Sequence, residues 1–181
     1  MAFPSEDAGA GEPDSPENVA DQGASFAYRV LSNWEALPGL IDGTLDGEKM
    51  RQWVVDAHSF CCRRGRQDMG EHMLGQVLSR APKGVDGIWP HEAVRELLEH
   101  YQSQSMEDGL SNGRFNAGEP KWRAFADGRH ERKEAEAYRA HARRMLAQWP
   151  RTARLLTQLA ETFECFGKAF DAEAQRREFS G

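Results

Sequence analysis

Apolar residues along this chain recur at spacings of three and four, which is the period of an amphipathic α-helix. Phe26, Val30, Trp34 and Leu37 form the first apolar stripe, and Pro38-Gly39 ends it. Similar stripes recur along the rest of the chain, and no segment shows a convincing alternation of apolar and polar residues. The pattern predicts an all-α fold, a single-domain bundle of about six helices.

The next helices have recognisable start and stop signals. Asp46 and Asp68 are expected to cap the second and third helices, and Gly65 is expected to end the second. Pro90 and Pro150 are expected in the first turns of the fourth and last helices, where the missing N–H costs nothing. The expected inward residues are Met50, Trp53, Val54, Ala57, Phe60, Met69, Met73, Val77, Leu78, Val94, Leu97, Leu98, Tyr101, Ala135, Tyr138, Ala142, Met145, Trp149, Leu155, Leu156, Leu159, Phe163, Phe166 and Phe170.

Residues 109–128 show neither a helical nor a strand period, so they are expected to form one long ordered loop between two helices. Loops of this length in compact domains are usually functional or disordered. This one carries Phe115, Trp122 and Phe125, and disordered segments are poor in aromatic residues. Its glycines at 109, 113 and 118 give only a weak indication of an anion cradle, because no strand precedes them.

Acidic residues concentrate at the N-terminus. Residues 1–22 contain six of the chain's 29 acids and no lysine or arginine, so the remaining 23 acids match the 23 bases. A segment rich in Pro, Gly, Ser and acid is expected to be disordered. We therefore predict a disordered acidic tail over 1–22 and a helical bundle domain over 23–181.

Cysteine usage and hydropathy indicate a cytoplasmic protein. The three cysteines are Cys61, Cys62 and Cys165, an odd number with two adjacent, which argues against a disulfide framework. The chain has no apolar run long enough to span a membrane and no secretory signal.

Each candidate enzymatic or metal-binding motif lacks a residue that its chemistry requires. The Asp42 to Gly47 segment resembles the start of a calcium loop, but Trp53 stands where the bidentate glutamate is required. His91-Glu92 resembles a zinc-protease helix, but Arg95 replaces the second histidine. Arginines after Cys61-Cys62 would favour a thiolate, yet no neighbouring motif completes a catalytic set. We expect no enzyme activity, no metal and no cofactor.

A basic run follows the predicted loop. Residues 129–154 contain eight lysines or arginines and three glutamates. Such a run can meet phosphates or an acidic protein. The interpretation that the sequence slightly favours is a solvated helix face, with Glu161, Glu164, Asp171 and Glu173 of the last helix neutralising it.

Several phrases together resemble a known domain: LSNWEALPG at 31–39, MGEHMLGQVLSRAP at 69–82, DGIWPHEAVRELLE at 86–99 and ERKEAEAYRAHARRMLAQWPRTARLL at 131–156. They resemble an uncharacterised all-helical domain found at the C-terminal end of large bacterial proteins, over about residues 26–174. The resemblance implies no catalytic residues. It implies a detached accessory module, which most naturally binds a protein.

These observations favour a non-enzymatic protein-protein interaction module of a bacterial cytosolic system. The alternative is a nucleic-acid-binding helical protein that uses the basic run. The expected partner-binding residues are Arg114, Phe115, Asn116, Trp122, Arg139, Arg143, Arg144, Arg151 and Arg154. The sequence leaves the partner and the oligomeric state open.

Overall fold

The computed structural model describes residues 37–117 and 128–178. The chain divides into Met1–Asn33 and Trp34–Gly181, and the described residues all belong to the second unit. The predicted acidic tail, the start of the first predicted helix, and Trp122 and Phe125 of the predicted loop lie outside the described residues.

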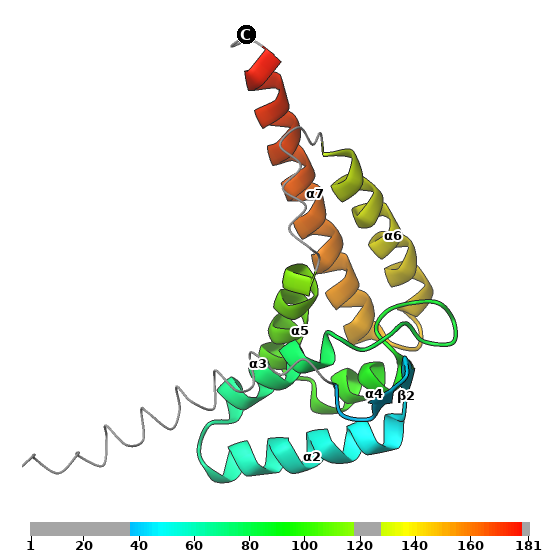
Figure 1. Cartoon of the computed structure of the whole chain (residues 1–181), viewed down its shortest axis with the longest axis vertical. Coiled ribbons are helices and arrows are strands. Elements are labelled where there is room, and N and C mark those ends of the chain that lie inside the picture. The colour runs from blue at the N-terminus through cyan, green and yellow to red at the C-terminus, as the bar shows by residue number, and fades with distance from the viewer. Residues whose placement is uncertain (1–36, 118–127, 179–181) are drawn as a thin grey trace, which may run out of the picture. The chain divides into compact units, whose positions relative to one another are not determined.

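Within those ranges the chain forms six helices and one short hairpin, which confirms the all-helical prediction (Figure 1). The two strands have two residues each and were not predicted. The elements are β1 (Leu40–Ile41), β2 (Thr44–Leu45), α2 (Gly47–Arg63), α3 (Gln67–Leu78), α4 (Glu92–Tyr101), α5 (Gln104–Ala117), α6 (Arg129–Met145) and α7 (Pro150–Glu178).

A tight turn leads from the hairpin into α2. Asp42 and Gly43 connect the antiparallel strands with positive φ angles of 49° and 79°, as a two-residue hairpin loop of type I′ requires. Asp46 then caps α2 by accepting a hydrogen bond from the Lys49 backbone N–H at 3.1 Å. The predicted cap is confirmed.

The C-terminal end of α2 lies where the sequence predicted it, but the start of α3 does not. Gly65 has a φ of 66° just after α2 and donates its N–H to the Cys62 carbonyl. α3 begins at Gln67 with Arg66 at the cap position and no side-chain cap. The predicted Asp68 cap is therefore wrong. Asp68 lies inside the first turn instead, where its negative charge suits the helix dipole.

Only one of the two Trp-Pro pairs opens a helix as predicted. Pro150 is the first residue of α7. By contrast, Pro90 precedes the first turn of α4, which is capped by the His91 ring accepting from the Ala93 N–H at 3.2 Å. The Trp89–Pro90 peptide bond is cis. The carbonyl of Pro90 faces the buried Arg95 guanidinium, which donates to it at 2.7 Å.

The predicted loop is wrong over residues 109–117, because these residues complete α5. Glycines made the segment look irregular, but they serve helix packing. A Cβ on Gly109 would lie 1.9 Å from the His72 carbonyl oxygen, and one on Gly113 would lie 2.3 Å from the Ser79 hydroxyl. On the facing helix, a Cβ on Gly75 would lie 2.1 Å from the Met106 carbonyl oxygen. Glycine lets α3 and α5 approach closely.

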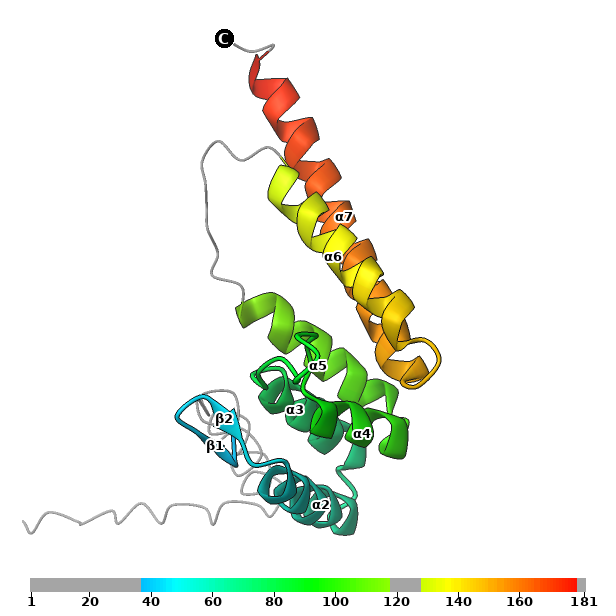
Figure 2. The ribbon, with the colours of Figure 1, turned by 90° about the vertical axis from the view of Figure 1, so that its right-hand side faces the viewer.

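α6 and α7 lie side by side along most of α6 (Figure 2). One buried apolar cluster takes side chains from β2 and from every described helix. The inward positions predicted for α6 and for the first half of α7 are confirmed. Four residues expected to point inward are exposed instead: Phe60, Met69, Phe166 and Phe170.

Candidate partner-binding groove

An open groove lies between the C-terminal end of α6 and the N-terminal end of α7. Its volume is about 350 Å³. The cations along it are Arg139, Arg143 and Arg154, and the less polar lining is Ala142, Leu146, Pro150, Ala153 and Thr157. We call it the α6–α7 groove. It therefore combines a mainly apolar surface with three guanidinium groups.

Local sequence explains the shape of the α6–α7 groove. The chain turns between the two helices with the Trp149 N–H donating to the Met145 carbonyl at 2.7 Å. The small residues Ala142 and Ala153 are buried between the helices. Leu146, at the C-terminal cap of α6, keeps 66% of its surface exposed. A large apolar side chain is thus left open to a ligand.

Spacing along α6 brings three of the groove residues onto one line. Arg139, Arg143 and Leu146 are separated by four and three residues, so they share one face of the helix. Sequence reasoning selected the two arginines but missed Leu146. The same spacing rule could have found it, since Leu146 stands outside the predicted inward stripe.

Carboxylates from the neighbouring helices meet several cations of the basic run. Arg139 pairs with Glu164 of α7, and hydrogen bonds from Arg139 and Lys168 hold the pKa of Glu164 below its usual range. Arg132 pairs with Asp171. Two of the four acids named for the solvated-face interpretation, Glu164 and Asp171, thus neutralise part of the basic run.

Glu107 of α5 neutralises two further arginines, and this was not expected. Its carboxylate is 1% exposed and accepts from the Nε of Arg151 at 2.6 Å and from Arg154. The backbone N–H groups of Arg151 and Thr152 donate to Glu99 of α4 at 2.9 and 3.1 Å. Arg151 therefore anchors the start of α7 to α4 and α5, while Arg154 also reaches the groove.

Arg143 and Arg144 are adjacent and exposed, and neither forms an ion pair with another described residue. Arg143 lines the α6–α7 groove. Arg144 does not line it. Burial of His141 lowers the pKa of that histidine most, and the positive charge of Arg144 lowers it further. The same charge also helps to lower the pKa of Asp86. The two arginines thus face different surroundings.

Two of the three predicted site residues of α5, Arg114 and Phe115, contact the domain itself. Arg114 donates to the Tyr138 hydroxyl at 2.9 Å, and its guanidinium lies 4.9 Å from the ring centre of Trp89. Phe115 stacks on Phe166 with ring centres 4.9 Å apart. Asn116 is exposed in the last turn of α5. The structure does not gather these three residues with the groove, and Trp122 lies outside the described residues.

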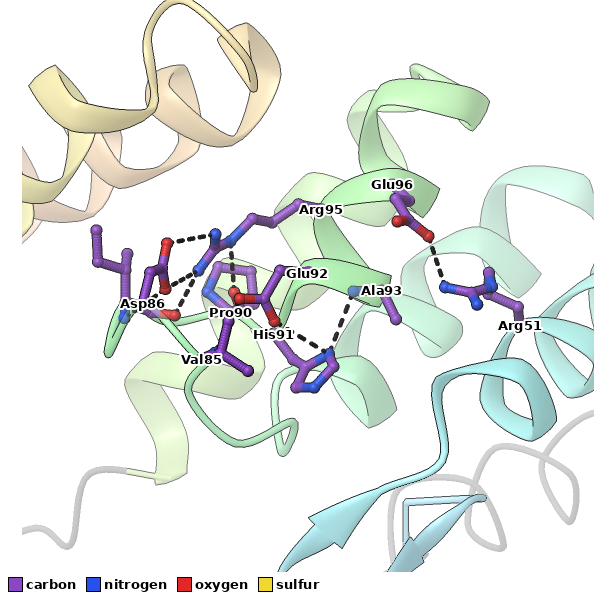
Figure 3. A network of polar contacts seen from close by, with 10 residues as sticks. Arg51, Val85, Asp86, Pro90, His91, Glu92, Ala93, Arg95 and Glu96 are labelled. Carbon is purple, nitrogen blue, oxygen red and sulfur yellow. Dashed lines mark hydrogen bonds and ion pairs between the residues drawn. The ribbon is translucent and has the colours of Figure 1, made fainter.

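An ion pair between the buried Arg95 and the partly exposed Asp86 fixes the segment that leads into α4. The Arg95 guanidinium donates to both oxygens of Asp86, at 2.8 and 2.9 Å, and to the Ile88 carbonyl at 2.6 Å (Figure 3). In the same view Arg51 of α2 reaches Glu96 of α4. These contacts hold α4, on which Glu99 meets α7, in place.

Across residues 37–117 and 128–178, no three His, Cys, Asp or Glu side chains are placed to hold a metal ion. None of the helices in these ranges is both long and apolar enough to cross a membrane. No protein family matches the chain, and no curated protein or solved structure is detectably similar to it.

Proposed function

We propose that this chain is a non-enzymatic interaction module that binds an acidic amphipathic segment of another protein in the α6–α7 groove. The observation that carries the proposal is the exposed Leu146 in one groove with Arg143, which pairs with no other residue in the described part of the chain. An amphipathic helix can place an apolar side chain over Leu146 and a carboxylate near Arg143. Laying an apolar helix face into a groove is a recurring mode of peptide recognition.

An open groove suits a peptide better than a small molecule. Small-molecule sites usually bury most of the ligand's surface. Here Leu146 keeps 66% of its surface exposed, so the site does not enclose a compact ligand. The Arg143 guanidinium, which pairs with no other described residue, supplies orientation and selectivity for acidic partners.

Charge distribution weighs against the nucleic-acid alternative. Phosphate binding needs cations that can neutralise several phosphates. Four of the eight cations in the basic run already meet carboxylates of the same domain, namely Arg132, Arg139, Arg151 and Arg154. A nucleic acid would have to compete with those contacts.

The proposed setting is a reducing bacterial cytosol, where an accessory module serves a larger system. The three cysteines are free, which suits a compartment that keeps thiols reduced. The resemblance to an accessory domain of bacterial proteins supports the same setting.

Peptides selected from a display library against the whole protein provide the test. We expect enrichment of acidic sequences with apolar residues at helical spacing. Leu146→Glu should weaken their binding at least about tenfold, because the new carboxylate repels an acidic peptide and removes the apolar contact. Val85→Glu, at an apolar residue that is 98% exposed, is the matched control and should leave affinity unchanged.

A second pair of variants separates the groove from general charge. Arg143→Ala and Arg144→Ala remove the same charge from adjacent exposed positions. The proposal expects affinity to fall only for Arg143→Ala. Two results together would favour the nucleic-acid alternative instead: an equal loss of peptide affinity for both variants, and binding of the protein to nucleic acid that weakens steeply as salt is added.

A further inference from the structure

Cys62 lies one helical turn after His58 on α2. Its Sγ is 3.7 Å from each of the two ring nitrogens of that histidine. The Cys62 thiol is exposed, whereas Cys61 is half-buried and burial raises the pKa of its thiol. Cys165, on α7, is exposed as well. Among the described cysteines, Cys62 is the exposed one with a histidine beside it.

A buried glutamate fixes the histidine from the neighbouring helix. Glu71 of α3 is 4% exposed, and its Oε1 lies 2.9 Å from the Nε2 of His58. Burial raises the pKa of Glu71, but hydrogen bonds from Ser103, Gln67 and His58 outweigh it and hold that pKa below its usual range. Both Glu71 oxygens accept hydrogen bonds, Oε1 from the Gln67 amide and Oε2 from the Ser103 hydroxyl, which is the arrangement of an ionised carboxylate at neutral pH.

The ionised carboxylate determines the histidine tautomer. A carboxylate only accepts hydrogen bonds, so the neutral His58 ring must carry its hydrogen on Nε2. The lone pair is then on Nδ1, the nitrogen left for the thiol. Tyr101 of α4 packs on the imidazole with ring centres 4.5 Å apart. Side chains from three helices thus hold a thiol, a base and a carboxylate in the order that activates a nucleophile.

The residues after Cys62 are basic and exposed. Arg63, Arg64 and Arg66 surround the end of α2, and the Arg64 guanidinium lies 4.7 Å from the Phe60 ring centre. A cluster of cations raises the local concentration of anionic reactants. The electrophile that this site favours is therefore small and negatively charged.

We propose that Cys62 is a nucleophilic thiol that undergoes exchange with anionic low-molecular-weight disulfides, with His58 as its base. Nδ1 takes the proton from Sγ, and the resulting thiolate attacks one sulfur of the disulfide. The S–S bond breaks, its electron pair leaves with the second sulfur as a thiolate, and that thiolate takes the proton from Nδ1. Cys62 ends as a mixed disulfide, and one equivalent of small thiol is released.

Two reagents test the inference on the whole chain: the anionic dithiobis(nitrobenzoate) and the neutral dithiodipyridine. Cys61→Ser/Cys165→Ser leaves only Cys62 reactive, and Cys61→Ser/Cys62→Ser leaves only Cys165. At neutral pH and low salt we expect Cys62 to react with the anionic reagent about tenfold faster than Cys165. Added salt should lower the ratio of the Cys62 rate to the Cys165 rate more with the anionic reagent than with the neutral one.

Histidine variants in the Cys62-only background decide whether His58 acts as the base. His58→Gln should slow Cys62 about tenfold with both reagents while the thermal midpoint stays unchanged. His72→Gln, on α3 and hydrogen-bonded to Gln76, is the control and should not change the rate. Cys62 reacting no faster than Cys165 with either reagent, or unaffected by His58→Gln, would overturn the proposal.

Discussion

Arg95 is a cation with only 1% of its surface exposed, so its stability depends on the partners around it. The two carboxylate oxygens of Asp86 and the carbonyls of Pro90 and Ile88 accept four hydrogen bonds from its three nitrogens. Removing one partner of a buried pair leaves a charge without compensation, which usually costs more than the intact pair contributes. The pair therefore matters most when it is broken.

Asp86→Asn should lower the free energy of unfolding by about 2 kcal/mol near neutral pH, less than for a fully buried pair because the Asp86 side chain is 27% exposed. Chemical denaturation at a series of pH values measures it. Hydrogen bonds from Arg95 lower the pKa of Asp86 to about 2, below the ~3.9 of an unfolded chain. The stabilisation is thus complete above pH ~4 and is lost as pH falls towards 2, so the gap between the two proteins should close over that range.

Glu96→Gln serves as the control for this substitution. Glu96 lies next to Arg95 in α4 and pairs with Arg51, but both of these side chains are partly exposed. An exposed pair contributes at most about 1 kcal/mol. A cost for Asp86→Asn no larger than that of Glu96→Gln would show that Arg95 does not need its carboxylate.

At the scale of elements, the glycines of α3 and α5 explain where sequence reasoning failed. Gly109 and Gly113 lower the helical propensity of α5, and together with the later polar residues they resembled a loop. The packing that requires them involves residues of α3 more than thirty positions away, which no local pattern reveals. Local signals could be read from the sequence: the Asp46 cap and the Lys49 N–H that donates to it lie within one helical turn, and Pro150 acts at its own position at the start of α7.

Gly109→Ala tests the close approach of the two helices. Alanine would favour an isolated helix by about 1 kcal/mol, but its Cβ would lie 1.9 Å from the His72 carbonyl oxygen. We expect a net destabilisation of about 1–3 kcal/mol in urea denaturation, because a backbone must move. Asn112→Ala, on the exposed side of α5, should instead be neutral or slightly stabilising. A stabilised Gly109→Ala variant would contradict the packing account.

The candidate site was also only partly readable at this scale. Arg139, Arg143 and Arg154 were selected from charge alone and line the α6–α7 groove. The acidic partners of Arg151 and Arg154 were missed, since Glu107 precedes them by more than forty residues. Helical spacing says which residues share a face, but not which distant helix that face meets.

At the scale of the whole molecule, the 23 acids outside residues 1–22 balance the 23 bases, but the ion pairs between them are unevenly distributed. The basic run looks one-sided in the sequence, yet carboxylates of α5 and α7 neutralise much of it in space. Arg143 and the exposed Leu146 remain together in the groove. The central claim is that this small surface, rather than the whole basic run, receives a protein partner.

Site-specific cross-linking in the protein's own host cells tests that claim most directly. A photoreactive amino acid would replace Leu146 in one version of the chain and Val85 in another. We predict a discrete protein adduct from position 146 only, with the cross-linked peptide carrying acidic residues and apolar residues at helical spacing. Adducts of equal yield at both positions, or a position-146 adduct with nucleic acid or with a peptide lacking acidic residues, would contradict it.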